Sequence, residues 1–251
     1  MGSHLTLAAM IGGVPFLDPS FRPGALLAAV AVVRARAAHG DGAESLPGDA
    51  LRALLRPSVA LELRVTQGLA RRIPNAPLSE ARAAQVEVAM ARLATLPSWR
   101  PLLELPLAVR GLVDHPATSC SCYGVPQHIF LSESAFDDAV GLEEYVLHEV
   151  CHNWMYCIEE IRVLHPAEFP GRYTLPTGTA GRNPTEVIGA AHVASTLIRW
   201  YRHQNGQPER VRDLSRYLAG CIELLEGMPP GALTATGIEV AERLANERVI
   251  G

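Results

Sequence analysis

The stretch 141-GLEEYVLHEVCHNWMYCIEEIRVL-164 decides how the chain folds, because a helical pattern and a short motif coincide in it. Its apolar side chains recur at three- and four-residue spacing, which predicts one long amphipathic helix. Within it, His148-Glu-Val-Cys-His152 reads H-E-x-x-H. Positions i and i+4 of a helix lie about 40° apart around its axis, so both imidazoles project from one face. The two rings could therefore share a metal ion.

Two carboxylates accompany this histidine pair. Glu149 is turned by about 100° from His148 on the helix, so it is expected to flank a bound metal as the catalytic carboxylate. Glu144 lies four residues before His148, where it either orients an imidazole from behind or is an ordinary solvated carboxylate. The competing interpretation of the whole motif is a pair of core histidines satisfied by hydrogen bonds.

The composition narrows the class of protein. The chain has 251 residues, of which 48% are hydrophobic, and a net charge of −4 with arginine as its only strong cation. It shows no basic patch typical of a nucleic-acid site. The apolar run 25–33 is too short to cross a bilayer and does not have the flanks of a secretory signal, so we expect a cytoplasmic protein with no membrane partner. Five cysteines without framework spacing argue against a disulfide scaffold.

Helix signals dominate the chain. Helices are expected at 24–39, 48–71 with a break at Pro57, 78–96, 185–203, 208–226 and 232–249, besides the motif helix with its N-cap at Ser132 or Ser134. One strand is expected at 127–132. The predicted fold is mainly α: a helical domain with a small β edge and a zincin-like HExxH helix. Residues 1–110 are expected to pack on the catalytic region, residues 111–251, in one compact unit.

Two residues compete for the place of the third metal ligand. Glu186 and His192 follow the motif by 34 and 40 positions, counted from His152, on the next long helix. Their six-residue separation turns them about 240° apart, so one metal cannot easily reach both. His192 is favoured because the small residues around it permit close helix packing, whereas Glu186 suits the first turn of a helix without any metal.

The order of these elements resembles a known family. A small-residue loop and a strand ending in Phe-Leu-Ser132 precede the motif, and Tyr173, Arg182-Asn-Pro184, Gly189-Ala-Ala-His192 and Trp200-Tyr201 follow it. Residues 115–205 are in this respect similar to the HExxH domain family of ribosomal-peptide natural-product pathways. Members of that family are α-ketoglutarate-dependent peptide β-hydroxylases.

The resemblance implies a dioxygenase with Fe(II), α-ketoglutarate and O2, acting on a ribosomal precursor peptide. The iron ligands would be His148, His152 and either His192 or Glu186. Arg182 or Arg199 would bind the distal carboxylate of the co-substrate, and Tyr173 could hydrogen-bond it. The N-terminal helices or the exposed edge of the 127–132 strand would hold the peptide.

Two other functions remain open at this level. A zinc metallopeptidase would use His148, His152 and Glu186 as ligands, with Glu149 as the general base for a zinc-bound water. A peptide-binding protein with a purely structural metal would need no role for Glu149.

Overall fold

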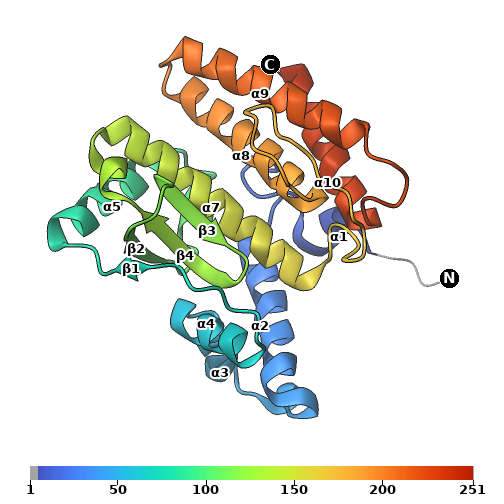
Figure 1. The fold of residues 1–251 in the computed structure, drawn as a ribbon. Coiled ribbons are helices and arrows are strands. Elements are labelled where there is room, and N and C mark those ends of the chain that lie inside the picture. The colour runs from blue at the N-terminus through green and yellow to red at the C-terminus, as the bar shows by residue number, and fades with distance from the viewer. Residues whose placement is uncertain (1–4, 251) are drawn as a thin grey trace. The chain divides into compact units, whose positions relative to one another are not determined.

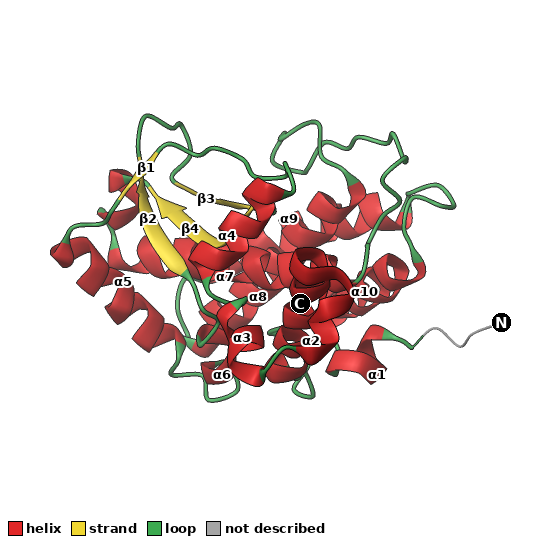
Figure 2. Cartoon of the chain, turned by 90° about the horizontal axis from the view of Figure 1, so that it is seen from below, coloured by secondary structure: helices red, strands yellow, loops and turns green. Residues whose placement is uncertain are grey.

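The computed structural model describes residues 5–250, and it divides the chain into two compact units. One unit, called here the motif unit, is Pro23–Ile161; the other, called the terminal unit, combines the residues up to Arg22 with those from Arg162 onward. The described residues form ten α-helices and one four-stranded sheet, which confirms the expected mainly α fold with a small β element (Figures 1 and 2). The division differs from the expected boundary near residue 110, since helices on both sides of that point pack on one another within the motif unit.

The motif unit contains most of the elements. Its helices are α2 (Pro23–His39), α3 (Gly48–Ala53), α4 (Pro57–Thr66), α5 (Glu80–Leu93), α6 (Arg100–Leu103) and α7 (Ala139–Ile161), with short 3-10 turns at Gly40–Ser45 and Glu133–Phe136. Its strands are β1 (Asn75–Ala76), β2 (Ala108–Leu112), β3 (Ser119–Cys122) and β4 (Val125–Leu131). The break expected at Pro57 is the start of α4, because proline fits the first helical turn.

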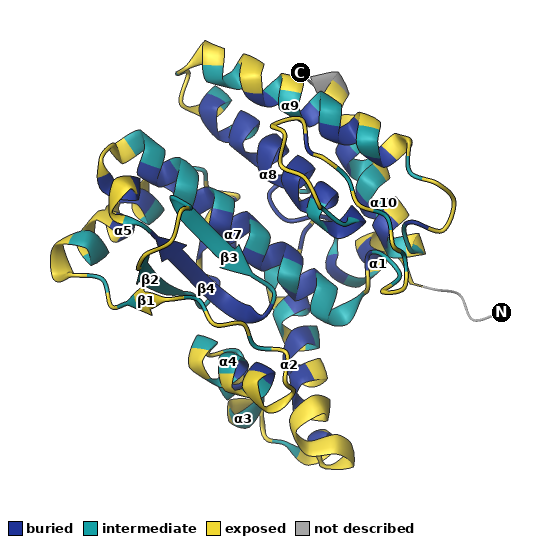
Figure 3. Ribbon diagram, viewed as in Figure 1, coloured by how far each residue is buried: buried dark blue, intermediate teal, exposed yellow. Residues whose placement is uncertain are grey.

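The sheet has the strand order β1-β2-β4-β3. β2 runs parallel to β4, whereas β3 and β1 are antiparallel to their neighbours. The strand expected at 127–132 therefore exists as β4, but its expected exposed edge is wrong: β4 lies between two strands and is buried along its whole length (Figure 3). The edge strands of the sheet are β1 and β3, and β3 is half-buried.

The motif helix α7 begins later than its expected cap. Asp138, rather than Ser132 or Ser134, precedes it, and the Asp138 carboxylate accepts the backbone N–H of Gly141 at 2.6 Å. α7 packs against β3, β4, α2 and α5. Its buried Trp154 donates from Nε1 to the Leu102 carbonyl at 2.9 Å, which fixes the helix within the unit.

The terminal unit contains only helices as regular elements in the described residues, joined by loops that include one isolated β-bridge between Tyr173 and Arg182. It consists of α1 (Leu7–Ile11), α8 (Pro184–His203), α9 (Pro208–Glu226), α10 (Ala235–Ala245) and a final 3-10 turn, Asn246–Ile250. α8 and α9 pack closely along each other, and α8 is buried over most of its length. Within the described residues, none of the helices has both the length and the apolar composition to span a membrane.

Candidate metal centre

The two motif histidines face each other on α7. Their Nε2 atoms are 3.1 Å apart, and their ring centroids are separated by 4.8 Å. Both side chains are half-buried. Two atoms this far apart would subtend roughly 95° at a metal ion about 2.1 Å from each. The same separation fits an N–H···N hydrogen bond between a donor ring and an acceptor ring, whereas metal binding needs a lone pair on both Nε2 atoms. The pair thus fits two ligands of one metal ion.

The carboxylate of Glu149 is held by the edge strand. It accepts hydrogen bonds from the hydroxyls of Ser119 at 2.7 Å and Ser121 at 2.6 Å, one to each oxygen. The side chain is only 2% exposed. A buried carboxylate needs such donors, and two charge-assisted bonds fix both its position and its orientation. Each oxygen keeps a further lone pair, so Glu149 can still accept a proton or another hydrogen bond.

Other side chains of β3 and α7 enclose this carboxylate. Tyr156 stacks on His152 with ring centroids 6.0 Å apart, and its hydroxyl donates to the Ser121 carbonyl at 3.4 Å. Burial, the Glu149 charge and Cys122 raise the pKa of Cys120 to about 11. Burial likewise raises the pKa of Cys122. Burial thus disfavours the thiolate form of both cysteines.

The favoured third ligand, His192, belongs to the terminal unit. It is completely buried on α8, and its Nε2 donates to the Pro15 carbonyl at 2.9 Å within that unit. Burial lowers its pKa to about 4, against the opposing effects of the Pro15 bond and of the Asp18 and Glu247 charges. Its Nδ1 atom is buried without a hydrogen-bond partner. A neutral imidazole held by a carbonyl with its other nitrogen free has the protonation state of a metal ligand, but also that of a core histidine.

The alternative ligand Glu186 and the loop residues also lie in the terminal unit. Glu186 completes a capping box with Asn183 at the start of α8 and pairs with Arg182 at 2.7 Å. Arg182 exchanges backbone hydrogen bonds with Tyr173, and its Nε is buried without a partner. Glu186 is therefore used as a helix cap, as its position in the first turn indicates.

Arg199 is occupied by another carboxylate. Its guanidinium makes two hydrogen bonds to Glu247, at 2.7 and 3.0 Å, and a third to the Phe16 carbonyl at 3.3 Å. Arg243 binds the same Glu247 carboxylate at 2.7 Å. Of the two arginines predicted to bind a co-substrate, Arg182 alone has a guanidinium nitrogen that is buried without a hydrogen-bond partner.

The described residues contain no group of three or more histidine, cysteine, aspartate or glutamate side chains placed to hold a metal ion. Glu144 lies on α7 one turn before His148 and is half-buried, and it does not complete such a group. The structure thus brings together His148, His152 and Glu149. The third ligand and the α-ketoglutarate contacts stay predictions from the sequence.

Ser119, Ser121 and Tyr156 are the neighbours of the motif that sequence reasoning missed. Ser119-Cys-Ser-Cys122 alternates with a period of two, which is a strand pattern, but its small residues suggested a turn. Tyr156 follows His152 by four positions, so helical spacing alone could have placed it on the histidine face.

Comparison with known proteins adds no assignment: no protein-family model matches the chain, and no curated protein matches it.

Proposed function

We propose that the chain is an Fe(II)- and α-ketoglutarate-dependent oxygenase that hydroxylates the β-carbon of a side chain in a ribosomally made precursor peptide. The observation that carries the proposal is the approach of the His148 and His152 Nε2 atoms to 3.1 Å beside a buried carboxylate. Two imidazoles fit iron as well as zinc, and the resemblance of residues 115–205 to peptide β-hydroxylases favours iron.

One feature of the site supports an oxygenase over a hydrolase: each oxygen of Glu149 already accepts one serine hydroxyl. This arrangement suits a fixed hydrogen-bond partner better than a base that must turn toward a water molecule.

The residues of the motif unit have distinct tasks in this proposal. His148 and His152 hold the metal, and Tyr156 packs against the His152 ring and limits its rotation. Glu149, anchored by Ser119 and Ser121, supplies a fixed negative charge beside them. When bound, Fe(II) and α-ketoglutarate would supply the oxidation: O2 provides one oxygen atom to the C–H bond and one to the co-substrate, which becomes succinate and CO2.

The edge strand β3 is the proposed place for the peptide. It lies at the end of the sheet order, it is half-buried, and α7 packs against it. An extended peptide can pair with the free edge of a strand through backbone hydrogen bonds alone. The serines that anchor Glu149 lie on the same strand, so a peptide along β3 would pass close to that carboxylate.

A zinc peptidase is the second candidate, and one observation favours it. The antiparallel edge strand and the H-E-x-x-H helix lie in contact, with Glu149 between them. This arrangement would also present a scissile peptide to a general base. Under this alternative Glu149→Gln abolishes peptide cleavage while leaving metal affinity within about twofold.

An anaerobic absorption titration tests the proposal without knowledge of the substrate. Metal-free protein receives one equivalent of Fe(II) and then α-ketoglutarate. We expect a weak visible charge-transfer band that needs both additions and is absent in His148→Ala, with His39→Ala, an exposed histidine of α2, as the matched control. A protein that binds Zn(II) stoichiometrically, gives no band and cleaves peptides would refute the oxygenase.

A further inference from the structure

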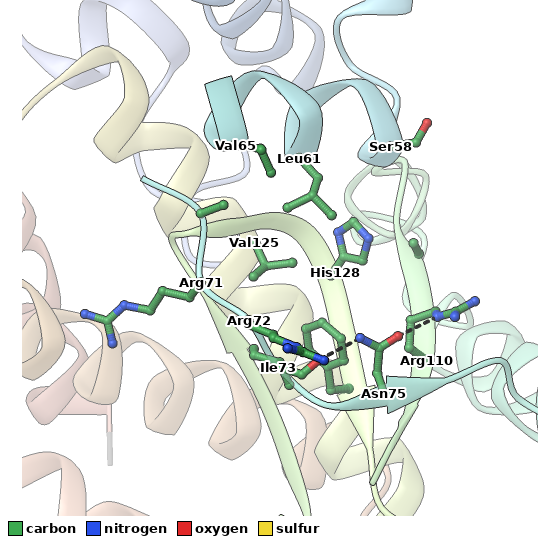
Figure 4. A pocket seen from close by; sticks show the side chains of 13 residues that line it. Ser58, Leu61, Val65, Arg71, Arg72, Ile73, Asn75, Arg110, Val125 and His128 are labelled. Atoms are coloured by element: carbon green, nitrogen blue, oxygen red, sulfur yellow. Dashed lines mark hydrogen bonds between the residues drawn. The ribbon is translucent and has the colours of Figure 1, made fainter. Parts of the chain in front are cut away.

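A groove in the motif unit lies apart from the candidate metal centre. It has a volume of about 590 Å3, and it is lined by α4, by the segment that leads into β1 and by the strands β2 and β4 (Figure 4). No residue of α7 is among its lining residues, so the groove is separate from His148 and His152. Its volume lies within the range of ligand sites in proteins.

The accessible walls of the groove are apolar. Leu61 and Val65 lie one turn apart on α4, and Ile73 lines the groove from the segment before β1. Val65 is 61% exposed, whereas the other two are half-buried. The two aromatic lining residues, His128 and Phe130 of β4, are only 9% and 1% exposed. A partner can therefore bury aliphatic surface along the walls, but the lining residues present no accessible ring on which it could stack.

The charged groups of the groove are all cationic. Its lining residues include Arg71, Arg72 and Arg110, and no aspartate or glutamate. Within residues 5–250, none of the three guanidinium groups forms an ion pair. Figure 4 shows the Arg72 and Arg110 guanidinium groups on opposite sides of Asn75, whose amide oxygen accepts from Arg110 Nε at 3.0 Å, while Arg71 points away from both. Arg72 and Arg110 thus suit two separate carboxylates rather than one.

The segment that leads into β1 also offers free backbone groups. Arg72 is exposed and lies outside the strands, and neither its N–H nor its C=O forms a hydrogen bond with another described residue. On either side of it the segment is held: the Arg71 N–H donates to the Gly124 carbonyl at 3.4 Å, and the Pro74 carbonyl accepts from the Val113 N–H at 3.1 Å. A fixed backbone with a free donor and acceptor can pair with a further extended chain.

We propose that this groove binds an acidic peptide segment of a partner protein in an extended conformation. Alternate side chains of an extended chain point to opposite sides, so apolar residues can contact Leu61 and Val65 while carboxylates reach Arg72 and Arg110. Each guanidinium can donate two parallel hydrogen bonds to its carboxylate. The peptide backbone pairs with the free groups of Arg72.

Charge complementarity favours this occupant. The chain carries a net charge of −4, yet the groove holds arginines without a carboxylate among its lining residues. A single-stranded nucleic acid fits less well, because its bases need exposed aromatic rings for stacking. The inference goes beyond the proposed oxygenase and does not depend on it, since no residue of the H-E-x-x-H motif contributes.

Calorimetric titration with a heptapeptide of alternating glutamate and leucine, blocked at both ends, tests the groove. We expect one peptide to bind per chain with a Kd below about 1 mM, more weakly as the salt concentration rises. Arg72→Gln and Arg110→Gln should each weaken binding at least threefold, and the double variant at least tenfold. The matched control is Arg36→Gln, an exposed arginine of α2 outside the groove, whose affinity should stay within twofold of the wild type.

The apolar wall is tested separately by Val65→Ser, which should weaken binding at least threefold. Val88→Ser is its control, because Val88 lies on α5 outside the groove and is 56% exposed, against 61% for Val65. Two further peptides test the unaltered protein. The peptide with lysine in place of glutamate should not bind, and the peptide with serine in place of leucine should bind at least tenfold more weakly.

Several results would overturn the proposal. These are absence of glutamate-peptide binding at millimolar concentration, equal affinity for the lysine or serine peptide, and wild-type affinity in the Arg72→Gln/Arg110→Gln double variant. Tighter binding of a short oligothymidylate than of the glutamate peptide would assign the groove to nucleic acid instead. His148→Ala should bind the glutamate peptide like the wild type, so a failure here is distinct from a failure of the proposed oxygenase.

Discussion

The histidines of α7 and the histidine of α8 were predicted to bind the same metal, yet their surroundings differ. His148 and His152 are half-buried and turn their Nε2 atoms toward each other at 3.1 Å. His192 has no exposed surface, and its Nε2 is committed to the Pro15 carbonyl. A pair within one helix has its relative direction set by helical geometry, whereas the environment of a single distant histidine depends on how its own unit packs.

The largest expected effect on stability is that of His192→Ala. The substitution leaves a cavity in a closely packed core and removes the hydrogen bond to Pro15, so it should lower the free energy of unfolding by about 3 kcal/mol. His203→Ala, an exposed position on the same helix, should cost less than about 0.5 kcal/mol. Urea unfolding measures both. Equal losses in the two variants would show that burial does not distinguish these histidines.

The effect of pH on the free energy of unfolding should be almost as large as that of His192→Ala. Because burial lowers the pKa of His192 to about 4, only the unfolded chain binds a proton there between pH 6.5 and 4. The stabilisation is complete above pH 6.5 and is lost as the pH falls toward 4, about 2 kcal/mol between pH 6.5 and 5. Denaturant titrations at these two pH values measure it against His192→Gln, which cannot titrate. If the unfolding free energy of His192→Gln changed with pH as much as that of the wild type, His192 would not be the group responsible.

The anchoring of Glu149 should have a smaller effect. Ser119→Ala/Ser121→Ala removes both hydroxyls from a carboxylate that is 2% exposed, which should cost about 2 kcal/mol of stability. It should also alter the absorption band of the Fe(II) complex, because the charge beside the metal is no longer fixed. Ser134→Ala, at an exposed serine of the same unit, is the control. An unaffected stability would mean that the two hydroxyls do not hold the carboxylate.

The smallest expected effects on stability are those of substituting the two arginines predicted to bind the co-substrate. Arg199→Gln breaks a bidentate pair with the buried Glu247 and should cost about 1 kcal/mol, since Arg243 still binds that carboxylate. Arg182→Gln breaks a half-exposed pair within one helical turn and should cost less than about 0.5 kcal/mol. If Arg182 binds α-ketoglutarate, its variant should weaken that binding at least tenfold in the iron titration. If only Arg199→Gln weakened α-ketoglutarate binding, Arg199 and not Arg182 would be the residue that binds it.

The local parts of this fold could be read from the sequence. α8 and α9 occupy the expected ranges to within one residue, and α7 ends within about three residues of its expected end, because apolar periodicity and prolines act over short distances. The start of α7 was expected four to six residues too early. β2 and β3 were missed: β2 is Ala108–Leu112, which contains Gly111, and β3 is Ser119–Cys122, whose small residues have weak strand propensity. Their place in the sheet depends on pairing with β4, and the missing strands made β4 seem to be the edge.

The same distinction applies to the candidate site. The H-E-x-x-H spacing predicted the convergence of His148 and His152, because one helix determines it. The serines that hold Glu149 lie 28 and 30 residues away along the chain, and no spacing rule reaches them.

Stoichiometric Co(II) binding tests the central claim that His148 and His152 form a metal site. Metal-free wild type, His148→Ala, His152→Ala and the control His39→Ala are titrated anaerobically and followed by visible absorption and equilibrium dialysis. We predict one Co(II) per chain in the wild type and in His39→Ala, and at least a hundredfold loss of affinity in each motif variant. Wild-type affinity in either motif variant would contradict the account and leave the two rings as a hydrogen-bonded pair.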